Sequence, residues 1–286
     1  MPLAPLLLAA ALVLPPAPLL ILGPGDEAVQ LIAAKLAFQE GYASTHLSLR
    51  KDRALRLMFG RQWPPAGRRP SIASSNVEIG GALASAEASL LCIASNTDAS
   101  SPSGVTPLLR SAPRLRRVVL LSAIGGSKGS GGLTYLGEGA KILECEREVR
   151  RQTEEAGVEL SIVRVGVLKG GAAAEGSGVG LDAEAYYATL SSGGYVTPRL
   201  QCAREYDVRT LGVRVTAGDS IKPRSAFARA ASQALYQPEE DEVSRINAAS
   251  ALIACLRLNA PIEISLSTKA AVVCPSPRDW ERMLCL

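Results

Sequence analysis

Gly23, Gly25 and Ala28 follow a short apolar stretch with the spacing G-x-G-x-x-A. Residues 18–22 predict a buried strand, and the apolar positions after Ala28 predict a helix that ends at Gly41. Such a turn lets the backbone approach a pyrophosphate closely, and the free N–H groups at the start of the helix point at the anion. The motif predicts a dinucleotide site with Gly23, Gly25 and Ala28 as binding residues. A strand–turn–helix unit without a ligand is the alternative.

Three residues of the turn weaken the fit to a pyrophosphate. Pro24 has no N–H group to donate. Asp26 and Glu27 suit the start of a helix, but they place negative charge beside a dianion. We therefore expect weaker binding than a turn without these residues would give.

Two cations, Arg50 and Lys51, follow the next predicted strand, residues 45–49. An acidic residue at this place would hydrogen-bond the ribose of NAD, whereas Arg pairs with a phosphate through two nitrogens. Arg50 and Lys51 therefore favour NADP over NAD; the alternative is that they open a solvated helix. We expect Ala94 and Ser95, at the end of the predicted strand 90–94, to line the same cofactor site.

The rest of the chain alternates between strand and helix patterns. Strands are predicted at residues 18–22, 45–49, 77–79, 90–94, 117–121, 160–165 and 262–266, and a further one at 208–215. Helices are predicted at residues 51–59, 82–88, 140–156, 182–190, 225–236 and 277–285. Alternation of this kind implies an α/β fold, a doubly wound parallel sheet of the Rossmann type, with a small C-terminal extension on the substrate side.

Composition excludes several classes of protein. The chain has 286 residues, of which 47% are hydrophobic and 20% charged, so it is neither disordered nor collagen-like. A net charge of +4 is too small to predict nucleic-acid binding. Six scattered Cys and one His predict neither a zinc site nor a disulfide framework. The basic stretch 61–69, which contains Trp63, is interpreted as a solvated loop.

The first residues are apolar but interrupted by proline. Residues 1–17 are interpreted as a leader or a disordered segment, and residues 18–286 as a single domain. Prolines there would interrupt a membrane-spanning helix. A peripheral membrane contact through the first residues stays open as an alternative.

Four segments resemble the atypical short-chain dehydrogenases/reductases of the NAD(P)-binding, NmrA-like kind. They are residues 22–25, residues 49–52, residues 118–125 and residues 156–166, with Lys141 and Glu146 between the last two. The chain departs from the family in a shortened glycine turn and in Gly80-Gly81, where the family has Gly-Asp. The resemblance implies a Rossmann-like fold that binds NADP(H), and a plastid location, with the cytoplasm as the alternative.

The resemblance also implies catalytic residues. Reductases of the wider superfamily place a Tyr four residues before a Lys, whose charge lowers the pKa of the phenol. Gly137 stands four residues before Lys141, and the nearest phenol is Tyr135. Ser122, at the end of a strand, matches a substrate-orienting hydroxyl or caps that strand. Tyr135, Lys141 and Ser122 are thus the candidate catalytic residues, and Lys141 is also a candidate contact to the cofactor ribose.

Two functions follow from these features. The missing Tyr and the shortened turn favour a dinucleotide-binding protein with weak or absent redox catalysis and a sensor, assembly or scaffold role in a protein complex. Arg50, Lys51, Ser122 and Lys141 favour the alternative, an NADP-dependent reductase or isomerase of a small carbonyl or quinone-like compound.

Overall fold

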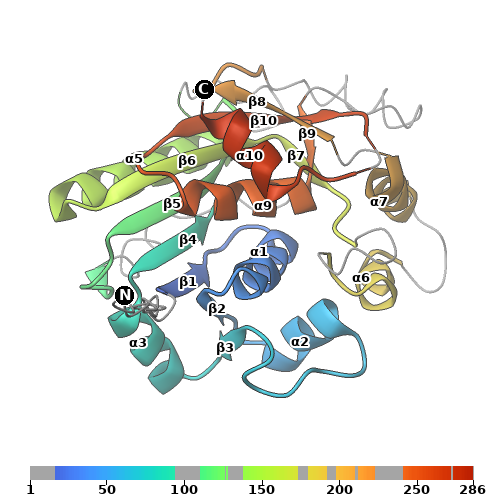
Figure 1. Ribbon diagram of the computed structural model, residues 1–286, viewed down its shortest axis with the longest axis horizontal. Helices are drawn as coiled ribbons and strands as arrows, with labels where there is room; N and C mark the ends of the chain where they lie inside the picture. Colours follow the sequence, from blue (N-terminus) through green and yellow to red (C-terminus); the bar gives the residue numbers. More distant parts are fainter. Residues whose placement is uncertain are drawn as a thin grey trace, which may run out of the picture.

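Eight strands form one sheet in the order β3-β2-β1-β4-β5-β6-β10-β8 (Figure 1). This computed structural model describes residues 17–93, 110–125, 127, 138–172, 180–191, 198–209, 212–222, 241–271 and 273–285. The strands are β1 (Pro18–Leu22), β2 (Ala43–Leu47), β3 (Ser71–Ala73), β4 (Ala88–Cys92), β5 (Arg117–Ala123), β6 (Glu159–Val165), β8 (Gly212–Ala217) and β10 (Glu263–Lys269). Neighbours run parallel except β8, which is antiparallel to β10. The predicted doubly wound α/β fold is confirmed.

Helices cover both faces of the sheet, as an almost wholly apolar parallel sheet requires (Figure 1). One core contains residues of α1 (Glu27–Gln39), α2 (Lys51–Phe59), α9 (Arg245–Leu256) and α10 (Pro277–Leu284). The other contains residues of α3 (Asn76–Ser85) and α5 (Glu138–Ala156). Two short strands, β7 (Val167–Lys169) and β9 (Glu242–Ser244), pair outside the main sheet, near α6 (Ala183–Leu190) and α7 (Pro198–Arg209).

Helix α9 was not predicted from the sequence, although it packs against α1 in the middle of a helical layer. Ten of its residues are buried, from Ile246 to Leu256 with the one exception of Ser250. A helix that is buried on nearly every side has no polar face, so the periodicity that reveals a surface helix is missing. The Ser244 hydroxyl caps its first turn by accepting from the Ile246 N–H.

The predicted strand at residues 77–79 is wrong, because these residues lie in α3 and the third strand is Ser71–Ala73. Ser75 and Glu78 form a capping box that starts the helix before Val77, whose side chain is 86% exposed. Strand β2 lies two residues earlier than predicted. Of the strand predicted at 208–215, residues 208–209 end α7 and residues 212–215 begin β8. The helix predicted at 225–236 lies outside the described residues.

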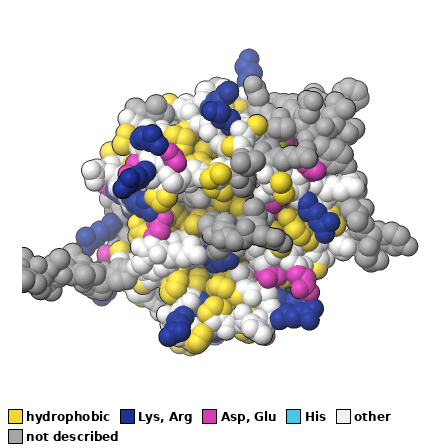
Figure 2. Space-filling view, turned by 45° about the vertical axis from the view of Figure 1, so that its right-hand side comes forward, with side chains coloured by type: hydrophobic (Ala, Val, Ile, Leu, Met, Phe, Trp, Pro, Cys, Tyr) yellow, Lys and Arg dark blue, Asp and Glu magenta, His cyan; other side chains and the backbone are white. Residues whose placement is uncertain are grey.

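Charges of both signs are mixed on the face that Figure 2 shows, where Lys and Arg side chains stand beside Asp and Glu side chains. Among the described residues, no helix is long and apolar enough to cross a membrane.

Replacing Gly23 by Ala should lower the free energy of unfolding by about 3 kcal/mol or more. Gly23 has a φ of +133°, and a Cβ atom there would lie 2.2 Å from the Cys92 carbonyl oxygen. Gly80→Ala is the matched control, because Gly80 is helical and open, so Ala should stabilise by about 0.5–1 kcal/mol. Urea unfolding measures both, and a Gly23→Ala protein as stable as the parent would contradict the close packing of β1 against β4.

His46 should make the protein less stable in acid. Burial lowers the pKa of His46 from 6.5 to about 4. Between these two pH values the ring is neutral in the native state, whereas the unfolded chain binds a proton there. Stability from this group is complete above the unfolded pKa and is lost as the pH falls through the folded one. Relative to His46→Leu, the parent should lose about 3 kcal/mol between pH 7 and pH 4 in urea unfolding. A constant difference across that range would refute the shift.

Candidate functional site

The crevice of a doubly wound sheet lies where the chain leaves adjacent strands in opposite directions. Here these strands are β1, which continues through α1 to β2 on one side, and β4, whose other neighbour is β5. The turn of residues 23–26 follows β1 at this point. The topology therefore brings the predicted Gly23, Gly25 and Ala28 to the place where this fold accepts ligands.

The glycine turn is held by hydrogen bonds within the protein. The Gly25 N–H donates to the Cys92 carbonyl oxygen (2.9 Å), and Gln30 Nε2 donates to the carbonyl oxygens of Gly23 and Gly25 (3.2 Å each). Gly23 is required for the close approach to β4. The two glycines thus have a packing role in this structure, and the Gly25 N–H already has an acceptor.

Asp26 occupies the N-terminus of α1 with its own carboxylate. Its Oδ1 accepts from the Val29 N–H (3.1 Å), and Arg245 Nε donates to Oδ1 (3.1 Å) and Oδ2 (3.0 Å). Arg245 Nη1 also donates to the Gly170 carbonyl oxygen (2.9 Å). The side chains of Asp26 and Arg245 are only 11% and 13% exposed. An internal anion with its own counter-ion therefore lies where the sequence predicts a pyrophosphate.

Asp207 fixes the neighbouring segment, residues 170–172. Its carboxylate accepts from the N–H groups of Gly171 (2.7 Å) and Ala172 (3.1 Å) and from the Tyr187 hydroxyl (2.6 Å). Burial raises the pKa of Asp207 to about 6. No sequence pattern singles out Asp207 or Arg245, because their partners are distant along the chain.

Arg50 and Lys51 lie at the carboxyl end of β2, as predicted. Arg50 is exposed and directly precedes α2, and Lys51 Nζ lies 3.9 Å from Glu78 Oε1. The Glu78 carboxylate accepts from the N–H groups of Ser74 and Ser75, which lower its pKa to about 2. The pair of cations therefore stands beside a fixed carboxylate, with the Arg50 side chain facing solvent.

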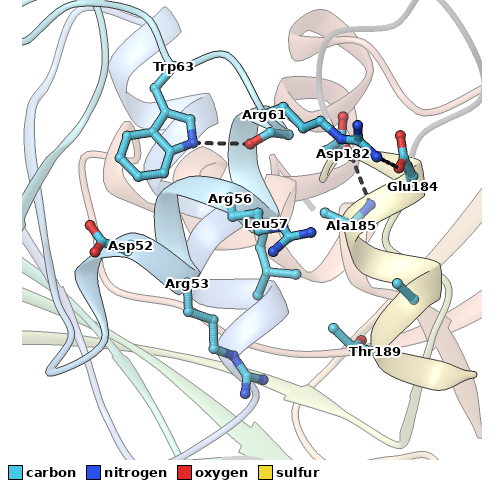
Figure 3. Close-up of a pocket in the computed structure, with 12 residues that line it drawn as sticks. Asp52, Arg53, Arg56, Leu57, Arg61, Trp63, Asp182, Glu184, Ala185 and Thr189 are labelled. Carbon is cyan, nitrogen blue, oxygen red and sulfur yellow. Dashed lines mark hydrogen bonds and ion pairs between the residues drawn. The ribbon is translucent and has the colours of Figure 1, made fainter. Parts of the chain in front are cut away.

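A cavity of about 680 Å³ lies between α2 and α6 (Figure 3). Its walls include Arg53, Arg56 and Trp63, and none of the predicted cofactor or catalytic residues. It is therefore separate from the residues that the glycine motif singles out.

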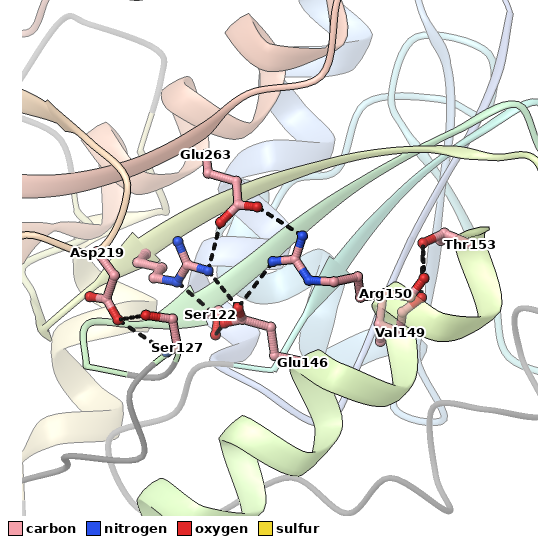
Figure 4. A network of polar contacts seen from close by, with 9 residues as sticks. Ser122, Ser127, Glu146, Val149, Arg150, Thr153, Asp219 and Glu263 are labelled. Atoms are coloured by element: carbon pink, nitrogen blue, oxygen red, sulfur yellow. Dashed lines mark hydrogen bonds and ion pairs between the residues drawn. The ribbon is translucent and has the colours of Figure 1, made fainter.

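Ser122 lies inside a charged network and has no exposed surface. Its hydroxyl donates to Glu146 Oε2 (2.8 Å) (Figure 4). Arg164 Nε donates to the same oxygen (3.3 Å), and Arg164 Nη2 donates to Glu263 Oε2 (2.9 Å). Arg150 links both carboxylates from α5. In this arrangement the hydroxyl serves the β5–α5–β6 packing, and a substrate-orienting role for Ser122 stays a prediction.

The remaining predicted residues are not tested. Lys141 belongs to α5, but its side chain is not among those described. Ala94, Ser95 and Tyr135 lie outside the described residues. The pairing of the Tyr135 and Lys141 side chains therefore stays a prediction.

Asp26→Asn should lower the free energy of unfolding by about 3 kcal/mol, because Arg245 then keeps a buried charge without its counter-ion. The amide still caps α1, so lost capping does not explain the effect. Adding Arg245→Met should recover most of the loss. The matched control Glu184→Gln breaks the exposed pair with Arg61 and should change stability by less than about 0.5 kcal/mol. Urea unfolding that gives Asp26→Asn a loss no larger than this control would contradict the account.

Comparisons with known proteins identify the fold. No family model and no curated protein sequence matches the chain. A wide-type short-chain dehydrogenase/reductase from Veillonella parvula, solved in complex with NADP, matches with 15% identity and a TM-score of 0.50, over 90% of this chain and 98% of that one. Gre2 from Candida albicans, in complex with NADPH, matches with 9% identity and a TM-score of 0.52, over 88% of this chain and 79% of that one. The reductase ChuY from Escherichia coli matches with 12% identity and a TM-score of 0.50, over 90% and 100%. The chain therefore has the Rossmann-like fold of these proteins.

Proposed function

We propose that the protein binds a nicotinamide dinucleotide in the crevice at the carboxyl ends of β1 and β4, with NADP(H) preferred over NAD(H). The observation that carries this proposal is the position of the glycine turn and the α1 N-terminus at the point where the strand order reverses. Ligands of doubly wound sheets bind at this point. Two proteins of the same fold were solved with NADP or NADPH.

The preference for NADP rests on Arg50. Its exposed side chain follows β2, next to β1 in the sheet, where the 2′-phosphate of an NADP ribose would lie. Arg50 has no ion-pair partner among the described residues, so its guanidinium can form a bidentate pair with a phosphate. Lys51 adds a second charge, which Glu78 partly offsets.

The role that fits best is binding rather than Tyr-dependent redox catalysis, as in a sensor, assembly factor or scaffold. Gly137 holds the position of the superfamily Tyr. The Ser122 hydroxyl is buried and bonded to Glu146, so it offers the crevice no donor. Asp26 places a charge beside the pyrophosphate position, which favours modest affinity and readily exchanging nucleotide.

A thermal-shift titration of the full chain with NADPH, NADP, NADH and NAD tests the proposal. A ligand that binds only the native state raises the melting temperature, by about 2–4 °C at ten times Kd. NADPH should give the larger shift, and NADH a smaller one at the same concentration. No shift with any of the four at millimolar ligand would refute dinucleotide binding.

Variants separate the NADP preference from binding itself. Arg50→Ala/Lys51→Ala should weaken NADPH binding about tenfold and leave NADH binding unchanged, because only NADPH carries the 2′-phosphate. Arg147→Ala/Arg278→Ala removes the same total charge from two other exposed positions and should leave both affinities unchanged. An equal loss for both nucleotides, or a loss in the control, would contradict a phosphate site at Arg50.

A further inference from the structure

Small residues form part of the wall of the cavity between α2 and α6. Gly60 contributes no side chain, and α6 contributes Ala188 and Ala185, of which Figure 3 labels Ala185. The two helices are joined at one end, where the Asp182 N–H donates to the Leu57 carbonyl oxygen (2.8 Å). A Cβ atom at Gly60 would lie 2.6 Å from Asp182 Oδ2, so this contact needs glycine. The volume of about 680 Å³ falls in the range of small-molecule sites.

Most charges around the cavity already have partners. Arg61 Nη2 lies 2.8 Å from Glu184 Oε1, and Arg53 Nη2 lies 3.1 Å from Glu27 Oε2. Asp182 Oδ1 accepts from the Ala185 N–H (2.8 Å) at the start of α6. The two ion pairs are each neutral, and the Asp182 carboxylate keeps its negative charge while it caps α6.

Arg56 is the cation of this cavity that lacks a partner. It is exposed on α2, lines the cavity, and forms no ion pair or side-chain hydrogen bond with any other described residue. Asp52 stands four residues before Arg56 on the same helix and also lines the cavity, but the two side chains form no ion pair. A guanidinium with its donors unused is a site for a carboxylate or phosphate oxygen.

Trp63 supplies a flat apolar wall. The residue is 41% exposed, and its Nε1 donates to the Gly60 carbonyl oxygen (3.0 Å), which fixes the ring beside the cavity. The Arg69 guanidinium lies 5.9 Å from the ring centre. The basic stretch 61–69 therefore has two of its arginines committed to contacts within the protein, Arg61 with Glu184 and Arg69 with Trp63.

We propose that this cavity binds a small organic anion, a molecule with a flat apolar body and one carboxylate or similar group. The anionic group pairs with Arg56, and the flat body lies against Trp63 and the small residues of α6. The site is separate from the dinucleotide crevice, because it shares no residue with the glycine turn or with Arg50 and Lys51. Binding of the organic anion therefore does not require dinucleotide binding.

Calorimetric titration of the full chain with 2-naphthoate and with its neutral amide, 2-naphthamide, tests this site. The two probes share a flat body and differ in charge. We expect saturable binding of 2-naphthoate, about tenfold tighter than that of the amide, because a hydrogen bond to a charged group is the stronger one. Absence of saturable 2-naphthoate binding at millimolar concentration, or equal affinity for the two probes, would overturn the proposal.

Three variants locate the binding. Arg56→Gln should remove the tenfold preference for the anion, whereas Arg147→Gln, at an exposed position of α5, should keep it. Ala188→Leu should weaken the binding of both probes, because the larger side chain occupies part of the cavity. Ala188 is exposed on a helix, so the substitution leaves the core unchanged, and an unaltered melting temperature verifies this. Affinities unaffected by Ala188→Leu and Arg56→Gln would place the probe elsewhere and overturn the proposal.

Discussion

The ion pair between Asp26 and Arg245 joins the two halves of the chain at the carboxyl edge of the sheet, which is the edge where doubly wound folds in general bind ligands. Asp26 caps α1, Arg245 begins α9, and Arg245 also binds the Gly170 carbonyl oxygen. Both side chains are largely buried, so neither charge can lose its partner without a large energetic penalty. The packing of α1 against α9 and the path of residues 170–172 therefore depend on this contact.

The same contact shapes what the crevice can do. The α1 N-terminus already has an anion, the Gly25 N–H already has an acceptor, and the Ser122 hydroxyl is bonded to Glu146. These groups are satisfied within the protein, so a dinucleotide would gain affinity mainly from exposed cations such as Arg50. These contacts support the proposed role in reversible binding rather than in the orientation of a substrate for hydride transfer.

The sequence was sufficient for the elements with strong local signals. The run of Val and Leu in β5 and the alternation of apolar and charged residues in α5 predict both elements closely. Helix α9 lacks a polar face, so periodicity could not reveal it. The capping box of Ser75 and Glu78 was a readable signal that the strand assignment at 77–79 overlooked. Arg245 could not be found, because its partner Asp26 is 219 residues away and only the fold brings the two together.

The most direct test of the account is a titration of the full chain with NADPH followed through backbone amide NMR signals. If the crevice at β1 and β4 binds the dinucleotide, the largest shifts should belong to the amides of Gly23, of residues 25–29 and of residues 50–51, and they should saturate together. Shifts confined to other parts of the chain, or no shifts at millimolar NADPH, would contradict a dinucleotide site at the point where the strand order reverses.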